Sequence, residues 1–148
     1  MLDVDAFKGY FLSHNAFVVR AVDSGHVMGV FYIKPNFPGR CSHICNGGFI
    51  TEPAFRGRGV GTLMAKAFLW LARDIGYKAS YFNLVFANNA ASQALWDGLG
   101  FTRLAVVPKA GRLKGVDGLV DAIQYYYDLE SLRDADNFLR TLSSEAEA

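Results

Sequence analysis

The strongest pattern of hydrophobic and polar positions lies between residues 60 and 75. Apolar side chains recur there at three- and four-residue spacings, at Val60, Leu63, Met64, Ala67, Phe68, Leu71 and Ile75. This spacing places them on one face of an α-helix. Gly76 follows at the position where a helix end favours a left-handed residue. The pattern therefore predicts a helix over residues 60–75.

Shorter apolar runs and turn residues predict the remaining elements. Strands are expected over residues 17–22, 27–33, 42–51, 81–86, 101–107 and 120–129. Helices are expected over residues 4–13, from an N-cap at Asn89 to Gly100, and in a polar tail after Leu129. This order predicts one domain over residues 1–148, with a polar tail from about residue 130. Its class is α+β, a mixed and mostly antiparallel central sheet flanked by helices.

Composition and charge narrow the classes of function. The chain has 148 residues and a net charge of +1, with acidic and basic residues interspersed. A nucleic-acid-binding domain would show a basic face, so nucleic acid is not an expected partner. No apolar run reaches the roughly 18–20 residues that span a bilayer, and the N-terminal segment carries acids where a leader peptide carries bases. We therefore expect a cytoplasmic protein without a membrane partner.

The two cysteines, Cys41 and Cys45, are expected to be free thiols. On one strand their Cα atoms would lie about 13 Å apart, whereas a disulfide needs less than about 7 Å. Together with His43 they would share one strand face, which raises the possibility of zinc. Strand spacing would hold the sulfurs too far apart, so no metal is expected. An acyl-cysteine intermediate on Cys45 is an open alternative.

A glycine-rich segment precedes the predicted helix at residue 60. Gly57, Gly59 and Gly61 alternate there, with Arg56 and Arg58 between or beside them. Glycines let a ligand approach the backbone, and the first amides of a helix attract anions. The segment predicts a pyrophosphate site, with a plain tight turn as the alternative. The dinucleotide-binding and nucleotide-triphosphate motifs do not fit this spacing.

Two motifs resemble those of a known enzyme family. The pattern Arg56-x-x-Gly59-x-Gly61 is similar to the signature of GNAT acetyltransferases, and so is the ending Asn89-x-x-Ser92-x-x-x-Trp96-x-x-x-Gly100-Phe101. A more specific resemblance, from about Phe7 to Leu129, is to the fungal azetidine-2-carboxylate N-acetyltransferases, which act on proline analogues. It is carried by FYIKPN, Arg40–His43, Cys45-Asn46, Phe82–Phe86, Val107–Gly111 and Val120–Ile123.

The resemblance implies a GNAT fold with an abbreviated N-terminal part. It also implies acetyl-CoA as cosubstrate and a small amine, such as a proline analogue, as acceptor. The implied cofactor contacts are Thr51, Arg56, Arg58, Gly59, Val60, Gly61, Thr62, Asn89 and Trp96. The alternatives are a polyamine or a protein N-terminus as acceptor, or a non-catalytic acyl-CoA-binding module. A homodimer is also an open possibility.

Three asparagines are candidates for the acceptor side of the reaction. Asn83 and Asn89 are expected to act in catalysis, and Asn46 is expected to bind the acceptor, as the resemblance implies. Asn83 interrupts an apolar run, and a buried amide needs partners. The alternatives are a structural hydrogen bond for Asn83, a helix cap for Asn89 and a bulge residue for Asn46.

Trp96 stands where many GNAT enzymes have a tyrosine that protonates the thiolate. An indole N–H donates a hydrogen bond but is not a usable acid. The row Tyr125–Tyr127 offers substitutes, although such a row is more often cross-strand packing. Lys109 and Arg112 could meet a CoA phosphate or an acceptor carboxylate, or be solvated loop residues.

Overall fold

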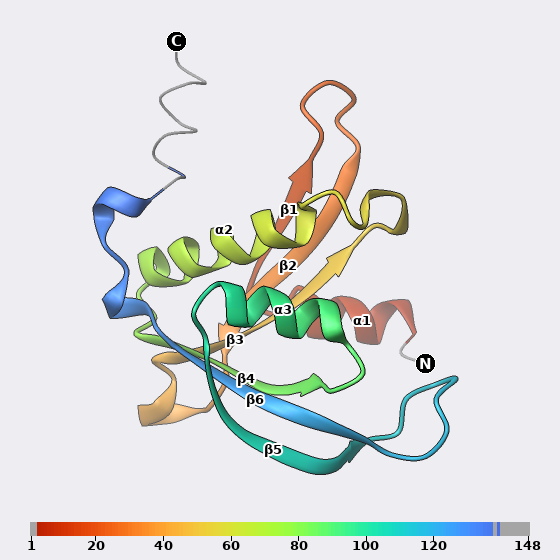
Figure 1. The fold of residues 1–148 in the computed structure, drawn as a ribbon. Helices are drawn as coiled ribbons and strands as arrows, with labels where there is room; N and C mark the ends of the chain where they lie inside the picture. Colours follow the sequence, from red (N-terminus) through yellow and green to blue (C-terminus); the bar gives the residue numbers. More distant parts are fainter. Residues whose placement is uncertain (1–2, 138, 140–148) are drawn as a thin grey trace.

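The computed structural model describes residues 3–137 and residue 139. The described residues form three α-helices and six strands (Figure 1). The helices are α1 (Val4–Phe11), α2 (Val60–Ile75) and α3 (Ala90–Gly98). The strands are β1 (Asn15–Arg20), β2 (Val27–Pro35), β3 (Ile44–Thr51), β4 (Ala79–Phe86), β5 (Thr102–Gly111) and β6 (Val120–Asp128). Short 3₁₀ turns connect some of them, including η1 (Gly39–Cys41) and η2 (Pro53–Phe55).

All six strands belong to one sheet in the order β1-β2-β3-β4-β6-β5. Neighbouring strands are antiparallel except for β3 and β4, which run parallel. The β3–β4 register contains only two pairs, Ile44 with Ala79 and Cys45 with Ser80. Beyond these pairs the two strands no longer form a ladder, which leaves an opening in the middle of the sheet. The predicted α+β class with a mixed, mostly antiparallel sheet is confirmed.

The helices cover the two faces of this sheet unequally. Successive side chains of a strand point to opposite faces of the sheet, so Phe31 and Tyr32 of β2 lie on different faces. Phe31 belongs to the core cluster that includes Phe68 of α2. Tyr32 instead meets Phe11 of α1 edge to face, at 5.0 Å between ring centroids. Thus α2 lies on one face and α1 on the other. Helix α3 joins the α2 face, because Trp96 contacts Phe82 and Phe49 there.

The predicted helix over residues 60–75 is confirmed. It begins after Gly59 and ends before Gly76, and both glycines have a left-handed backbone, with φ of 84° and 114°. The predicted apolar face is buried only in part: Val60, Met64 and Phe68 are buried, whereas Leu63 and Ile75 are exposed. The buried stripe instead continues through Ala65 and Ala72, so it is rotated around the helix from the expected face. This stripe fixes the start of α2 beside the opening in the sheet.

Other predicted boundaries shift by a few residues. The strand expected over residues 42–51 begins at Ile44, because η1 turns the chain and the Ser42 amide donates to Gly39 O. Cys41 and His43 therefore precede the strand, and their expected common strand face with Cys45 is wrong. β5 continues past the predicted end to Gly111, and it contains Pro108, which an edge strand tolerates. The predicted helix in the polar tail falls largely outside the described residues.

Candidate active site

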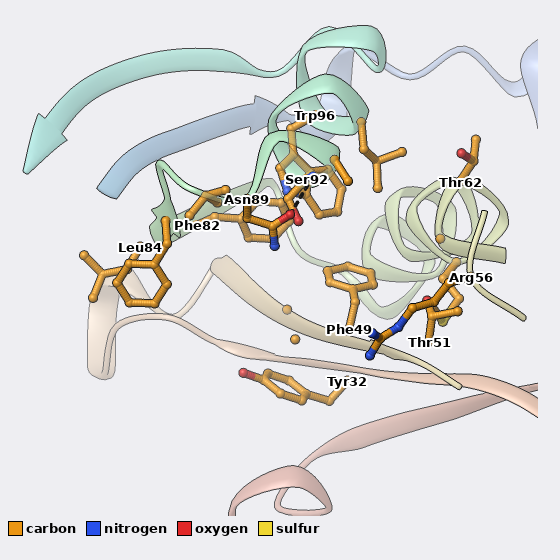
Figure 2. Close-up of a pocket in the computed structure, with 18 of the residues that line it drawn as sticks. Tyr32, Phe49, Thr51, Arg56, Thr62, Phe82, Leu84, Asn89, Ser92 and Trp96 are labelled. Carbon is orange, nitrogen blue, oxygen red and sulfur yellow. Dashed lines mark hydrogen bonds between the residues drawn. The ribbon is translucent and has the colours of Figure 1, made fainter. Parts of the chain in front are cut away.

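A cleft of about 990 Å³ opens where β3 and β4 separate (Figure 2). Its walls come from β3 and β4, and its ends from the start of α2, from α3, and from α1 with β2. In Figure 2, Tyr32 lies across the cleft from Asn89 and Trp96. The residues that line the cleft therefore come from segments far apart in the sequence, from Tyr10 to Trp96.

One end of the cleft is formed by the glycine-rich turn before α2. Thr51, Arg56, Gly57, Gly59, Gly61 and Thr62 line it. Gly57 and Gly59 have left-handed φ values of 70° and 84°, and no side chain caps the helix. The first intrahelical bond to Gly59 O comes from the Leu63 amide, so the amides of residues 60–62 have no acceptor within the helix. These amides and the helix dipole together favour an anion.

Gly61 adds a second observation in favour of a ligand at this end. It has no left-handed φ, and a Cβ atom there would meet no protein atom within 4 Å. Neither backbone strain nor packing within the chain explains a glycine at this position. The absence of a side chain leaves the space above the helix terminus open to a ligand.

The two arginines of this segment differ in position. Arg56 lines the cleft, and in Figure 2 it extends beside Phe49 and Thr51. Arg58 instead stacks over the Phe55 ring, 5.2 Å from its centroid, and does not line the cleft. The Val60 side chain is buried in the core, so only its backbone is available to a ligand.

Asn83 lies in the cleft wall formed by β4 and is paired with Asn36. The Asn36 Nδ2 donates to Asn83 Oδ1 at 3.0 Å, and the Asn83 Nδ2 donates to Asn36 Oδ1 at 2.6 Å. The Asn36 backbone amide is in turn bonded to Ile44 O, next to the start of β3. This reciprocal pair fixes the orientation of the Asn83 amide. Asn36 was missed as a site residue, and its only signal was its place in the FYIKPN segment.

Asn46 and Asn89 also line the cleft, each with a local hydrogen bond. Asn46 Oδ1 accepts from the Gly47 amide at 2.8 Å. Asn89 Oδ1 accepts from the Ser92 amide at 3.1 Å and so caps α3. The helix cap anticipated for Asn89 is present, and its side chain faces the cleft as well. Each amide group keeps its NH₂ available for a ligand.

Trp96 forms part of an aromatic floor beneath the cleft. Its ring lies 4.5 Å from Phe82 and 5.1 Å from Phe49 and Phe101, measured between ring centroids. Only 5% of its surface is exposed. The packing holds β3, β4 and α3 together on the α2 face. Trp96 therefore offers mainly an apolar surface to a ligand.

None of the three tyrosines from Tyr125 to Tyr127 lines the cleft. Tyr125 is completely buried, and its hydroxyl donates to Asp97 Oδ1 at 3.1 Å. Burial and the bond to Asp97 raise the pKa of Tyr125. The structure therefore gives this row no access to a bound thiolate. Lys109 and Arg112 also lie outside the cleft lining.

A cluster that sequence reasoning missed occupies the α1 side of the cleft. Tyr10 of α1 and Tyr32 of β2 both line it, and their hydroxyls lie 3.1 Å apart. The Lys34 Nζ sits 3.2 Å from the Tyr10 ring centroid and 4.7 Å from that of Tyr32. The rings cross at 89°. The only sequence signal was the alternation of Tyr32 and Lys34 on one strand face.

The cysteines take no part in this cleft. Cys45 is completely buried and does not line it, and burial raises the pKa of its thiol to about 12. A nucleophilic cysteine needs the opposite shift, which speaks against an acyl-cysteine on Cys45. Cys41 is exposed, and both cysteines are free. Over residues 3–137 and 139, no three His, Cys, Asp or Glu side chains gather as metal ligands.

Comparisons with known proteins agree with this geometry. A family model for the acetyltransferase (GNAT) family matches residues 2–101. N-acetyltransferase aca1 of Schizosaccharomyces pombe is 56% identical over 109 residues, which cover 74% of this chain and 52% of that protein. The chain thus spans about half the length of this relative.

Solved structures show the same fold. A GCN5-related N-acetyltransferase from Kribbella flavida superposes with a TM-score of 0.79 and 27% identity, covering 86% of this chain and 78% of that one. YncA from Salmonella typhimurium, solved with acetyl-CoA, gives a TM-score of 0.66 and 24% identity, covering 76% and 64%. The family model spans most of the chain, and the sheet opens at the cleft just described. The chain belongs to the GNAT family of acetyltransferases.

Proposed function

We propose that this protein transfers the acetyl group of acetyl-CoA to the amine of a small acceptor that also carries a carboxylate, such as the proline analogue azetidine-2-carboxylate. The observation that carries the proposal is the cleft between β3 and β4. It runs from an anion-binding helix terminus to a group of neutral amides, Asn46 and Asn83. A long cosubstrate and a short acceptor would meet between these ends.

The anion-binding end would hold the pyrophosphate of CoA. The amides of residues 60–62 donate to it, Gly61 leaves room for it, and Arg56 adds a positive charge. The pantetheine arm would then follow β3. Past Cys45, β3 has no ladder with β4, so its backbone groups on that side are available for hydrogen bonds. The apolar floor of Phe49, Phe82 and Trp96 excludes water near the thioester.

The reaction is a direct displacement on the thioester. The neutral amine attacks the carbonyl carbon and forms a C–N bond, and the carbonyl oxygen takes the negative charge. As the intermediate collapses, the C–S bond breaks and the electron pair leaves with sulfur. The proton released from the nitrogen ends on the thiolate to give free CoA. Positioning of the amine by Asn83 and Asn89 would supply much of the rate.

The charge of the cleft favours a small acceptor with a carboxylate over a polyamine. None of the described residues lining the cleft is an Asp or a Glu. A polyamine carries several positive charges and would be left without acidic partners there. An acceptor carboxylate, by contrast, can accept hydrogen bonds from the NH₂ group of Asn46. A cytoplasmic setting, where both free thiols stay reduced, is part of the proposal.

A panel of amines tested with acetyl-CoA, following thiol release, checks this proposal. Azetidine-2-carboxylate should be acetylated, while spermidine and a peptide N-terminus should give little turnover. In the Asn46→Ala variant, the KM for azetidine-2-carboxylate should rise with little change in kcat. The substitution removes a contact to the carboxylate that is equally strong in the ground state and in the transition state. Azetidine without the carboxylate is the matched control, and its KM should be the same for both enzymes.

Two results would contradict the proposal. Faster turnover of spermidine than of any acceptor with a carboxylate would exclude the acceptor class. Tight binding of CoA without thiol release for any amine would indicate an acyl-CoA-binding module instead. Light scattering of the same preparation would show whether the protein is a homodimer.

Over the described residues, no helix is long and apolar enough to cross a bilayer.

A further inference from the structure

The cleft contains very few groups that can exchange a proton. Among the described residues that line it, only Tyr10, Tyr32 and Arg56 carry ionisable side chains, and a guanidinium keeps its charge. An amine acceptor arrives largely as its ammonium form, which has no lone pair for attack. Some group must therefore take a proton from it before the chemical step.

We propose that the Tyr10 hydroxyl, as phenolate, is the base that takes this proton, with Tyr32 as its hydrogen-bond donor and Lys34 as a positioning residue. The proposal rests on the function proposed above, because it assigns the base for that reaction. Family resemblance pointed to the position of Trp96 for a proton-transferring tyrosine. In the structure, Tyr32 lies on the opposite side of the cleft from Trp96 (Figure 2), and Tyr10 of α1 is paired with it there.

The geometry of the pair suits this role. Tyr10 is half-exposed and reaches solvent as well as the cleft, so it can pass a proton onward. Tyr32 is buried, and its ring occupies the space that a side chain at Gly48 would need, 2.3 Å from an ideal Cβ atom. Gly48 therefore allows Tyr32 to lie flat beside β3, with its hydroxyl 3.1 Å from that of Tyr10. Across β3 lies the gap that would hold the thioester.

The surroundings stabilise a negative charge on Tyr10. Its hydrogen bond with Tyr32 and the nearby Lys34 ammonium lower the pKa of Tyr10, and burial opposes them only in part. Burial and the same hydrogen bond raise the pKa of Tyr32, so the proton stays on Tyr32. Both partners come from β2, and β3 places the neutral Asn46 opposite Lys34.

No other charged group contacts the Tyr10 hydroxyl within the described chain. On α1, Asp5 lies in the first turn and Lys8 in the last turn, and the groups that act on the Tyr10 hydroxyl are Tyr32 and Lys34. His14, which follows the helix, bonds to Ser13. Lys34 has no acidic partner among the described residues, so its charge is directed to the two rings. A cation held over an aromatic ring in this way is attracted by the ring and also stabilises its ionised form.

The acceptor ammonium gives one proton to the Tyr10 phenolate, which becomes a neutral hydroxyl and later returns that proton to solvent. The amine then attacks, and the second proton leaves the nitrogen for the CoA sulfur. No oxidant or reductant takes part. Turnover should therefore rise with pH as Tyr10 ionises.

A series of acceptors with different amine basicity tests the assignment. Tyr10→Phe should lower kcat/KM by about tenfold or more for basic acceptors at neutral pH, a modest share of the effect of a general base. Ring-fluorinated proline analogues have less basic amines, and for these acceptors the loss of kcat/KM in Tyr10→Phe should become small or disappear. It should also shrink for any acceptor as the pH approaches the pKa of its amine, because solvent then removes the proton.

Lys34 and a matched tyrosine provide the controls. Lys34→Met should move the rising limb of kcat/KM to higher pH, since the cation no longer lowers the pKa of Tyr10, and Lys34→Arg should restore it. Tyr77→Phe removes a hydroxyl outside the cleft and should change nothing. Two results would overturn the assignment. One is a loss of kcat/KM in Tyr10→Phe that is equal for all amines, and the other is an unchanged pH profile of kcat/KM in Lys34→Met.

A titration of tyrosine absorbance separates this proposal from the function on which it rests. Without any substrate, the wild-type protein should show one of its seven tyrosines ionising below the ordinary value of about 10. This transition should be absent in Tyr10→Phe and shifted upward in Lys34→Met. Its persistence in Tyr10→Phe would refute the role of Tyr10 even if the enzyme acetylates amines. A wild-type protein that acetylates none would refute the proposed function instead.

Discussion

The Asn83 amide has more hydrogen-bonding capacity than its partner Asn36 uses. An amide offers two donors and two acceptor lone pairs, and the reciprocal pair occupies one of each. The remaining N–H and lone pair belong to a side chain that lines the cleft. A rigidly held amide of this kind can orient an attacking amine directly or through water, although it cannot act as a base.

Replacement of Asn83 by alanine should lower kcat by at least about tenfold, a cautious share of the effect of one well-placed polar group. CoA affinity should change little, because the glycine-rich turn lies at the other end of the cleft. Steady-state kinetics with azetidine-2-carboxylate would measure this, with a melting temperature for each variant. Asn36→Ala is the matched control. It should have the smaller effect, since the Asn83 amide remains but loses its orientation.

Equal effects of the two substitutions would instead indicate that the Asn36–Asn83 pair only stabilises the sheet.

Sequence reasoning could identify Asn83, because a polar residue interrupted an apolar run. It could not identify the partner, because Asn36 is 47 positions away and sits in a loop whose path depends on the whole sheet. The same holds for Tyr10 and Tyr32, whose hydroxyls meet only after α1 packs on β2.

At the level of elements, the start of α2 was the most predictable part of the site. Periodicity fixed the helix, and the glycines marked both ends, so its bounds needed no tertiary information. The start of β3, which was predicted at residue 42 and lies at Ile44, could not be obtained from such local patterns. The alternation from Cys41 to Cys45 resembles a strand, but η1 bends the chain before Ile44, and this turn carries no strong local signal.

Gly61→Val should raise the Kd for CoA by about tenfold or more, because a branched side chain would fill the space over the helix terminus. Gly98→Val is the matched control. That glycine is also helical, has no left-handed φ and has open space around it, but it lies outside the cleft lining. Calorimetric titration with CoA would compare the two. Wild-type affinity in a folded Gly61→Val protein would exclude the turn as the pyrophosphate site.

At the level of the whole molecule, the sheet consists of two halves that meet at one weak seam. Strands β1–β3 pair with each other in chain order, and β4 pairs with β6, which pairs with β5. The two halves are joined by the two register pairs between β3 and β4, and also by the packing of α2 and of the aromatic floor. The overall α+β class followed from element order, whereas the length of this seam depends on contacts that no local pattern encodes.

A ligand that bridges the seam should stabilise the whole fold. CoA at about 100 times its Kd adds about 2.7 kcal/mol to the free energy of unfolding. For a chain of this size, that corresponds to a rise in Tm of roughly 5–11 °C. Differential scanning calorimetry with and without CoA would measure the shift. Gly61→Val should lose most of it, and a rise of the same size in that variant would place CoA elsewhere.

The short β3–β4 ladder also has a consequence for the order in which the sheet assembles. Each half is contiguous in the chain, so most strand pairing is local in sequence and can form early. The joining step must wait for α2 to cross from one half to the other. We expect this seam to close last and to open first, so a ligand bound across it would hold the two halves of the sheet together.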